Sequence, residues 1–381
     1  MFMIRTALLV IAICPGGWPA LQPLEKDSQS QNKAAVTPLE LPAPTGRLLI
    51  GTKVYNWVDR SRHEQASKNP ADFRQLVVQV WYPSQDRSGP AAAYVPMLSS
   101  YRHVWEDSDF EVAGRTLTHS RLNAKPMSST QFPVVLLSHG WEGTRSEYTS
   151  IAEDLASHGY AVFGVDHPYM GRVALPSGEV TEPSESQFHS PSEIVAYYAQ
   201  DLEFVIGQIA ELNRRDPEKT FTGRFDMARI AAIGHSSGFV AASGACKMDS
   251  RIKACVNVDA PGFSARDLAG LDQPLLWIRL QKADGVPAEY LKTAKATVYE
   301  LHIEGANHGS VEDWDYLEAV SRAQREAAGK VLQIIRQYVE AFLSRSLDHE
   351  NSKLLDASSV KSGLQWRVYS PGASSSPPPR P

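Results

Sequence analysis

The chain has 381 residues, of which 43% are hydrophobic and 21% charged, as is ordinary for a globular protein. Its formal net charge of -5 offers no electrostatic basis for binding nucleic acid, and no apolar run approaches the ~18 residues of a membrane span. These properties exclude a nucleic-acid-binding protein and a membrane-spanning one. They leave a globular enzyme or binding module.

The N-terminus has the layout of a secretory signal peptide. A positively charged start and a short apolar run, Thr6–Cys14, are followed by a Pro-Gly-Gly break and by Ala20, a possible cleavage point. We therefore assign residues 1–20 to a leader and expect a secreted or periplasmic protein. Lipoprotein anchoring through Cys14 and a helix packed on the body are the less favoured alternatives.

The residues after the leader change character in steps. Residues 21–46 are polar and dotted with proline, and are predicted to be a linker. Residues 48–57 and 75–83 alternate in a way that indicates two antiparallel strands joined by a charged hairpin. Residues 84–131 are irregular with scattered aromatics, and we expect an inserted segment of loops or short helices over one side of the body.

A regular alternation of buried strands and amphipathic helices follows. The expected strands are 134–137, 161–165, 230–233, 254–258, 274–280 and 297–303. The expected helices open with capping boxes at Thr144 and Ser190, follow the strand at 230–233, and close with a long helix at about 317–344. This order requires a doubly wound, mainly parallel sheet, here preceded by the antiparallel hairpin. We place the domain at 47–348 and expect the Pro- and Ser-rich tail, 349–381, to be mostly unpacked.

The central motif is Gly234-His235-Ser236-Ser237-Gly238, between a buried strand and a small-residue helix. In this context Gly-x-Ser-x-Gly is typical of the nucleophile elbow of an α/β-hydrolase. The turn is so tight that side chains at the two glycines would collide with the neighbouring strand and helix. We therefore predict Ser236 as a nucleophile, against the alternative of an ordinary Gly/Ser turn.

A serine nucleophile needs a general base and an acid that orients the base. His308, in a small-residue loop after the last predicted strand, is the natural base, whereas His302 lies inside that strand and is better explained by packing. Two aspartates end strands after the elbow, Asp259 and Asp284. Spacing alone does not choose between them.

The oxyanion hole needs two backbone N–H groups directed at the developing negative charge. In this fold one comes from the residue after the nucleophile, here Ser237, and the other from the loop after the strand at 134–137. Trp141 is the best candidate for the second donor, and glycines on either side allow the backbone to approach the substrate. His139 is more readily explained as structural than as a second base.

Two cysteines remain after the leader, Cys246 and Cys255. Export would permit a disulfide between them. Because one falls near a predicted helix end and the other inside an apolar strand, we favour two buried free thiols.

The chain resembles the plasma-type (type II) platelet-activating-factor acetylhydrolases and their bacterial relatives, over about residues 50–315. The resemblance is carried, in the family's order, by Trp81-Tyr82-Pro83-Ser84-Gln85-Asp86, Leu137-Ser138-His139-Gly140, Asp154-Leu155-Ala156-Ser157-His158-Gly159-Tyr160, Ile233-Gly234-His235-Ser236, Val258-Asp259-Ala260 and Gln273-Pro274-Leu275.

The resemblance implies a calcium-independent serine esterase that removes a short acyl chain from a phospholipid. It implies Ser236 as nucleophile, His308 as base and Asp259 rather than Asp284 as the acid, with Trp141 and Ser237 as oxyanion donors. Three residues depart from the family pattern, each of which could reshape the acyl pocket: Trp141, Ser237 and Phe239.

We therefore predict an exported serine esterase that acts through an acyl-enzyme, without metal or cofactor, most simply on short-acyl phospholipids of the platelet-activating-factor type. The alternatives are a broad short-chain carboxylesterase or cutinase-like polyester hydrolase, and a non-catalytic binding module on the same fold. The expected partner is a small ester or lipid molecule. Transient contact with a lipid surface is compatible with this prediction, and no oligomeric state is predicted.

Overall fold

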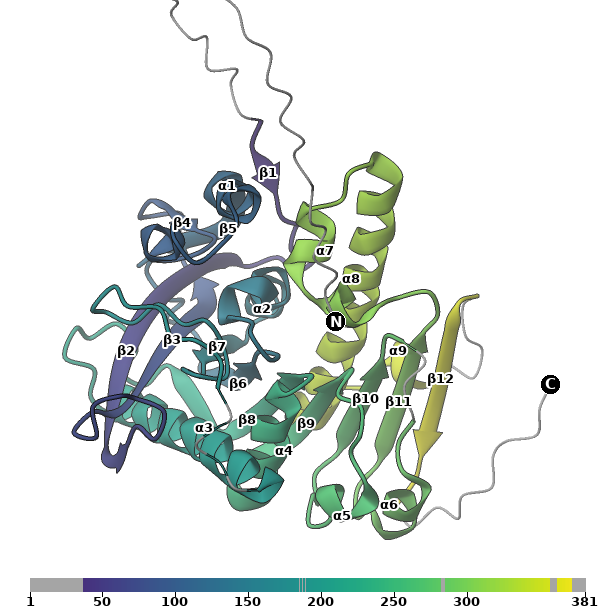
Figure 1. The fold of residues 1–381 in the computed structure, drawn as a ribbon. Coiled ribbons are helices and arrows are strands. Elements are labelled where there is room, and N and C mark those ends of the chain that lie inside the picture. Colours follow the sequence, from purple (N-terminus) through teal and green to yellow (C-terminus); the bar gives the residue numbers. More distant parts are fainter. Residues whose placement is uncertain are drawn as a thin grey trace, which may run out of the picture. The chain divides into compact units, whose positions relative to one another are not determined.

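A computed structural model describes residues 37–184, 186, 188, 190–281, 285–356 and 362–371. These residues form a 12-stranded twisted sheet with helices on both faces (Figure 1). The strand order along the sheet is β1-β5-β2-β3-β7-β6-β8-β9-β10-β11-β12, and β4 pairs with β5 to one side. The predicted leader, residues 1–20, lies outside the described residues.

The strands form a parallel centre, which antiparallel pairs join to β3 on one side and to β12 on the other. Their bounds are β1 Leu39–Glu40, β2 Leu49–His63, β3 Phe73–Ser84, β4 Ala91–Ala93, β5 Thr116–Leu122, β6 Phe132–Ser138, β7 Ala161–Asp166, β8 Phe225–His235, β9 Ile252–Val258, β10 Leu275–Arg279, β11 Val298–Ile303 and β12 Leu364–Tyr369. All neighbours from β7 to β11 are parallel. The β2–β3 hairpin is antiparallel and joins this centre through an antiparallel β3–β7 pair. The predicted α/β-hydrolase architecture, with its N-terminal hairpin, is confirmed.

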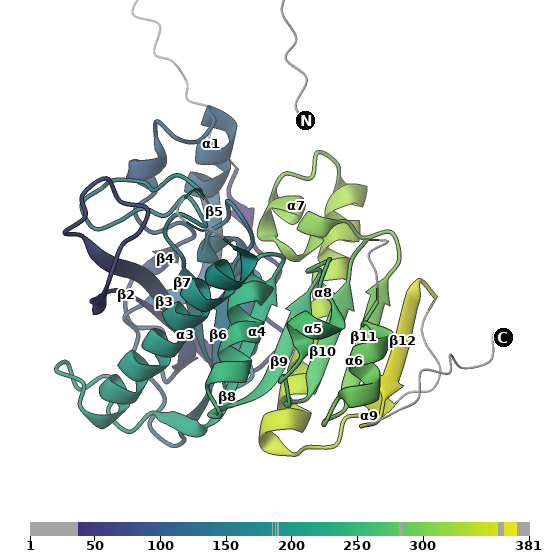
Figure 2. The ribbon, with the colours of Figure 1, turned by 60° about the horizontal axis from the view of Figure 1, so that its bottom comes forward.

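Helices cover the two faces of the sheet and bury a separate apolar core on each. The helix bounds are α1 Asp107–Arg115, α2 Thr149–Ser157, α3 Pro191–Arg214, α4 Gly238–Met248, α5 Ala265–Leu268, α6 Ala288–Thr293, α7 Asp313–Leu317, α8 Arg322–Leu343 and α9 Lys353–Asp356. Helices α3 and α4 lie side by side over one face (Figure 2). Helices α2 and α8 cover the other, where Leu155 and Phe342 are fully buried. Within the described residues, no helix is both long and apolar enough to cross a membrane.

Local sequence signals account for only some of the helix starts. The Ser190 hydroxyl accepts a hydrogen bond from the Glu193 N–H at the start of α3, as predicted. The capping box predicted at Thr144 does not form. That residue precedes a short 3₁₀ helix, η2 (Arg145–Tyr148), and its side chain makes no capping bond. The α-helix proper begins only at Thr149.

The region predicted as an irregular insertion, residues 84–131, instead supplies part of the sheet. Besides α1 it contains β4 and β5, and β5 pairs in parallel with both β1 and β2. Leu39 and Leu41 are buried in the same small apolar cluster as Tyr101. The domain boundary predicted at residue 47 is therefore wrong, because the packed body begins before it.

The C-terminal predictions need two corrections. The long helix predicted at about 317–344 is α8 and begins later, at Arg322, because Ser321 caps it by accepting from the Gln324 N–H. The predicted unpacked tail contains α9 and β12, and β12 pairs antiparallel with β11. Trp366 of β12 stacks on Tyr299 with ring centroids 5.6 Å apart. The structured domain thus extends past residue 348.

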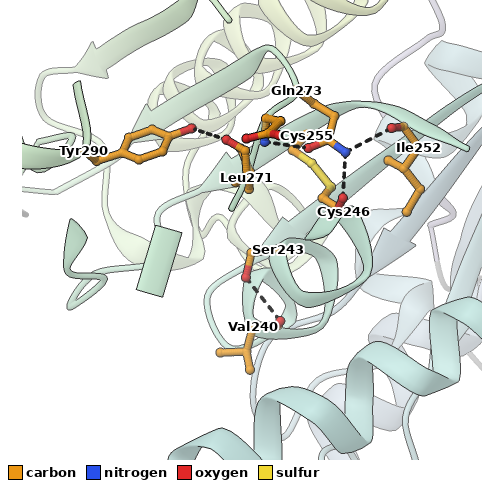
Figure 3. Close-up of a disulfide and its surroundings, with 9 residues drawn as sticks. Val240, Ser243, Cys246, Ile252, Cys255, Leu271, Gln273 and Tyr290 are labelled. Atoms are coloured by element: carbon orange, nitrogen blue, oxygen red, sulfur yellow. Dashed lines mark hydrogen bonds between the residues drawn. A yellow bond between two sulfur atoms is a disulfide. The ribbon is translucent and has the colours of Figure 1, made fainter. Parts of the chain in front are cut away.

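Cys246 and Cys255 form a disulfide, contrary to the prediction of free thiols (Figure 3). The bond joins the last turn of α4 to the middle of β9, and both residues are at least 99% buried. The Gln273 side chain supports the same corner by donating to the Cys246 and Ile252 carbonyls at 2.6 and 3.2 Å. Burial, which suggested free thiols, is equally compatible with a buried disulfide.

Candidate active site

The site lies where the parallel strands β6, β8, β9 and β11 end at the same edge of the sheet. Loops that follow parallel strands open at this edge, so their side chains can converge. The register places Ser138, the last residue of β6, beside Gly234 of β8. It places His235, the last residue of β8, beside Val258 of β9. Three chain-distant loops therefore meet around the turn after β8.

The Gly-x-Ser-x-Gly motif forms a sharp strand-to-helix turn. Ser236 has a φ of 51° and donates its N–H to the Val258 carbonyl at 3.0 Å. A Cβ at Gly234 would lie 2.4 Å from the Gly238 oxygen, and one at Gly238 would lie 2.3 Å from the Ser138 oxygen. Contacts this short with backbone atoms are not tolerated, so both flanking positions require glycine. The left-handed backbone of Ser236 is the strained conformation expected of an elbow.

The structure brings Ser236, His308 and Asp259 together in one hydrogen-bonded chain. The Ser236 Oγ lies 2.9 Å from His308 Nε2, and His308 Nδ1 lies 2.7 Å from Asp259 Oδ2. The other carboxylate oxygen of Asp259 accepts the Leu280 N–H at 2.8 Å, which fixes the carboxylate at the end of β10. In the tautomer with a proton on Nδ1, Nε2 is free to accept the serine proton.

The surroundings of the imidazole favour its charged form. The hydrogen bond that His308 donates to the Asp259 carboxylate raises the pKa of His308 above its usual value, although partial burial opposes the shift. Burial would raise the pKa of Asp259, but the hydrogen bonds from His308 and the Leu280 N–H outweigh it and hold that pKa below its ordinary range. The carboxylate therefore stays ionised and can balance a protonated imidazole.

The sequence also offered His302 as an alternative base and Asp284 as an alternative acid. His302 lies within β11, paired with Arg279 of β10, as expected of a packing residue. Asp284 lies outside the described residues.

The two predicted oxyanion donors, Trp141 and Ser237, line the same pocket. Among the described residues, the N–H groups of Trp141 and Ser237 have no acceptor, while those of Gly140, Glu142 and Ser236 are occupied. In the β6 loop, Gly140 N–H donates to the Tyr148 hydroxyl at 3.1 Å and Glu142 N–H to the Met170 carbonyl at 2.9 Å. Trp141 and Ser237 thus carry open donors on either side of the Ser236 turn.

A second hydrogen-bonded Ser–His–Asp chain begins at Ser138, the last residue of β6, and is buried. His167 Nε2 is 2.8 Å from Ser138 Oγ, and His167 Nδ1 is 2.8 Å from Asp201 Oδ2. All three residues are 1% exposed or less, so no substrate reaches them. His139 is likewise fully buried, and its Nε2 accepts the His167 N–H at 3.0 Å. Burial lowers the pKa of His139 to about 3, so it is neutral and structural, as predicted.

Two polar residues near the site escaped the sequence prediction. Tyr148 places its hydroxyl 2.7 Å from His235 Nδ1. Glu312, four residues after His308, has a carboxylate oxygen 3.4 Å from the same hydroxyl. Burial raises the pKa of Glu312 to about 7. Only its spacing from His308 could have suggested Glu312, and no local signal marks Tyr148.

A pocket of about 770 Å³ opens beside the elbow. Its walls are mostly apolar and come from α3, α4, the loop at 261–267 and Trp141, and Ser237 lies at its catalytic end. The ionisable residues in its lining are Lys247, Arg266 and Asp267, where α4 ends and α5 begins. The pocket therefore suits a ligand that is largely apolar next to Ser236.

Of the three departures from the family pattern, two line this pocket directly. Trp141 is 36% exposed at its rim, and Ser237 lies at its inner end. Phe239 is fully buried and packs edge-on against Phe263, at a centroid distance of 4.9 Å. Since Phe263 lines the pocket, Phe239 shapes the pocket only from behind.

Comparisons with known proteins relate this chain to esterases. Residues 68–218 match the family described as platelet-activating factor acetylhydrolase, isoform II, a span that includes the Trp141 loop and ends before Ser236. A probable 1-alkyl-2-acetylglycerophosphocholine esterase of Arthroderma benhamiae is 25% identical over 84% of this chain and 92% of its own length. The platelet-activating factor acetylhydrolase of Canis lupus familiaris is 23% identical over 44% of each chain.

A solved structure of a ferulic acid esterase from Streptomyces cinnamoneus superposes with a TM-score of 0.71 and 28% identity, covering 87% of this chain and 99% of that one. The fold and the site define a carboxylic-ester hydrolase of the α/β-hydrolase superfamily. Within that superfamily, the match over residues 68–218 and the two named relatives support a place among the platelet-activating factor acetylhydrolases, isoform II.

Proposed function

We propose that Ser236, His308 and Asp259 are the catalytic triad of this esterase. His308 Nε2 takes the proton from the Ser236 hydroxyl as Oγ attacks the ester carbonyl, and Asp259 stabilises the imidazolium that forms. The N–H groups of Trp141 and Ser237 donate to the oxyanion of the tetrahedral intermediate. The single observation that supports these roles most strongly is the continuous hydrogen-bonded chain of 2.9 and 2.7 Å from serine to carboxylate.

The second half of the reaction uses the same groups in reverse. The imidazolium gives its proton to the leaving alkoxide, which departs as the alcohol and leaves an acyl group on Ser236. Neutral His308 then takes a proton from water as the water attacks the acyl carbonyl. Collapse of this second intermediate releases the acid and returns the proton to Ser236. These steps require only side chains and water.

We propose short-acyl phospholipids of the platelet-activating-factor type as substrates. Two relatives, matched over 84% and 44% of this chain, are named for such lipids. The apolar pocket with Lys247 and Arg266 at its far end offers cations that could pair with a phosphate. Trp141 and Met248, 36% and 50% exposed, line the pocket and give an apolar rim for transient contact with a lipid surface.

A broad short-chain carboxylesterase is the second candidate. It is favoured by the likeness to a ferulic acid esterase, whose structure this chain covers almost completely. A panel of esters separates the two: 2-acetyl, 2-butyryl and 2-octanoyl phosphatidylcholines against p-nitrophenyl and ethyl esters with the same acyl groups. The lipid proposal predicts that kcat/KM for the 2-acetyl phospholipid exceeds that for ethyl acetate by at least about a hundredfold. Equal values on every short ester would exclude lipid specificity.

We also propose that the protein is exported. The predicted leader at residues 1–20 and the disulfide between Cys246 and Cys255 both favour an oxidising compartment. The mature N-terminus, measured by mass spectrometry on protein from the extracellular or periplasmic fraction, should begin near residue 21. An intact Met1 on cytoplasmic protein would contradict export.

A further inference from the structure

The hydroxyl of Tyr148 joins the three loops that build the site. Tyr148 ends η2 and is 2% exposed. Its oxygen accepts the Gly140 N–H at 3.1 Å and lies 2.7 Å from His235 Nδ1. It also lies 3.4 Å from Glu312 Oε1, a long contact.

Each partner is next to a proposed catalytic group. Gly140 precedes the oxyanion donor Trp141, and His235 precedes the nucleophile Ser236. Glu312 follows η3 (His308–Val311), the turn that begins with the base. One buried side chain therefore contacts the oxyanion loop, the elbow and the histidine loop, although it takes no part in the proton transfers.

Two of the groups at this contact, His235 and Tyr148, have settled protonation states at physiological pH, whereas burial raises the pKa of Glu312 to about 7. Burial lowers the pKa of His235 to about 3, so its ring is neutral at physiological pH. Burial raises the pKa of Tyr148 well above the usual value, so the phenol keeps its proton. The strong contact is thus between a neutral hydroxyl and a neutral imidazole, with the Gly140 N–H as a second donor.

The geometry of the loop shows what this contact controls. In a trans peptide the carbonyl and the following N–H point in opposite directions. The Gly140 carbonyl lies 2.7 Å from His139 Nδ1 and accepts the Gly143 N–H at 3.2 Å. These two contacts hold one side of the Gly140–Trp141 peptide, so the Trp141 N–H points away from them. The Tyr148 hydroxyl accepts the N–H of Gly140 itself. The Gly140–Trp141 peptide is therefore held by its own carbonyl and by the N–H that precedes it.

We propose that Tyr148 is a positioning residue whose hydroxyl, held by His235 beside the nucleophile, orients the Trp141 N–H toward the oxyanion. This inference rests on the proposed function, because it assigns Tyr148 a role in the reaction of Ser236. A positioning role of this kind acts on the transition state more than on the bound substrate, since the oxyanion exists only after attack.

The test compares Tyr148→Phe with Tyr82→Phe. Both replacements remove one buried hydroxyl and keep the ring. Tyr82 bonds the Ala124 carbonyl at 2.7 Å, on β3 and away from the catalytic loops. We expect Tyr148→Phe to lower kcat by about ten- to a hundredfold with KM changed less than about threefold. Tyr82→Phe should leave both within about twofold, with a similar change in the thermal midpoint.

A second readout separates positioning from a loss of stability. A trifluoromethyl ketone with a short acyl chain forms a tetrahedral oxyanion on the serine, and its affinity should weaken by the same factor as kcat. If Tyr148→Phe does not fold, His235→Leu and His235→Asn replace it. Asn keeps a hydrogen-bonding group near the Nδ1 position, so only the Leu variant should lose kcat.

Three outcomes would overturn the inference. They are an unchanged kcat in Tyr148→Phe, equal losses in Tyr148→Phe and Tyr82→Phe, and equal kcat in the two His235 variants. Ser236→Ala, measured alongside, tests the proposed function on its own. An inactive Ser236→Ala with a fully active Tyr148→Phe rejects only the role of Tyr148, whereas an active Ser236→Ala rejects the proposed function.

Discussion

Asp259 and His308 lie 49 positions apart in the chain, yet the carboxylate accepts from the imidazole Nδ1 at 2.7 Å. Asp259 is 2% exposed and has a left-handed backbone, with φ of 47°, at the end of β9. That turn directs its side chain across the end of β10 to the loop after β11, which carries His308. The buried carboxylate sets both the orientation and the charge of the imidazole.

Replacing Asp259 by asparagine should therefore change both the rate and its pH dependence. Without the carboxylate the imidazolium loses its partner, and we expect kcat to fall by about a thousandfold or more. Activity requires neutral His308, and Asp259 raises the pKa of that histidine, so the acid limb of kcat/KM should lie above the pH expected for a free histidine. In Asp259→Asn this limb should move to lower pH.

A pH–rate profile of kcat/KM for the two proteins measures this shift. Asp284→Asn is the matched control, because Asp284 is the other aspartate that the sequence offers. It should retain wild-type activity and an unshifted limb. A large loss in Asp284→Asn with an active Asp259→Asn would reverse the assignment.

The glycine at the start of the elbow helix should be irreplaceable. A Cβ on Gly238 would lie 2.3 and 2.4 Å from the carbonyl oxygens of Ser138 and His139, and neither backbone can retreat without moving the oxyanion loop. Gly238→Ala should cost about 1–3 kcal/mol of unfolding free energy and lower kcat strongly. Gly207→Ala on α3, where nothing lies within 4 Å, should instead stabilise the protein by about 0.5–1 kcal/mol.

Urea denaturation and steady-state kinetics on both variants test this contrast. Wild-type kcat in a stable Gly238→Ala protein would show that the elbow is less crowded than its geometry indicates.

The buried carboxyl of Asp313 should make stability fall as pH rises. Its Oδ2 accepts the Ser150 N–H at 3.1 Å, and burial raises its pKa to about 7. Because the folded pKa lies above the unfolded one, this group contributes stability at pH below about 4 and loses it as pH rises to about 7. Asp313→Asn removes the titration. The difference in unfolding free energy, Asp313→Asn minus wild type, should therefore be larger at pH 8 than at pH 5, by on the order of 2 kcal/mol.

Chemical denaturation at the two pH values measures the difference. The exposed Asp107, at 91% side-chain exposure, serves as control. The difference in unfolding free energy between Asp107→Asn and wild type should be the same at both pH values. Parallel curves for wild type and Asp313→Asn would contradict the account of this residue.

The buried Ser138–His167–Asp201 chain should stabilise the folded protein. Asp201 Oδ2 lies 2.6 Å from Arg74, and both residues are fully buried. Asp201→Asn leaves the guanidinium without its main partner and should cost about 3–5 kcal/mol. The exposed pair Lys295–Asp272 is the control, because Asp272→Asn should cost less than about 1 kcal/mol. Similar urea unfolding midpoints for Asp201→Asn and Asp272→Asn would contradict the structural role of Asp201.

Much of the fold could be predicted from the chain because the central strands are continuous apolar runs. The predicted strand at 134–137 lies within β6, which is buried throughout. The misplaced parts are at the edges of the sheet. β12 is mostly exposed and pairs with β11 from far along the chain, and β5 alternates weakly. Edge strands carry little local pattern, and only their partners define them.

The site residues likewise differ in whether the local sequence predicts them. The elbow is a contiguous motif, and the loop around His308 follows a strand, so both were visible locally. The acid was chosen over Asp284 only by the family resemblance, since two strand ends offered an aspartate. Tyr148 could not be predicted as a site residue, because its contacts with Gly140 and His235 exist only once β6 and β8 are adjacent.

The central claim is that Ser236 forms the acyl-enzyme, and covalent labelling tests it most directly. Wild-type protein is treated with a fluorophosphonate, and the intact mass and the labelled peptide are measured beside Ser236→Ala. The account predicts one adduct per chain, on the peptide that contains Ser236, with no adduct and almost no ester hydrolysis in Ser236→Ala. An adduct on another residue, or a Ser236→Ala protein that hydrolyses esters at the wild-type rate, would contradict it.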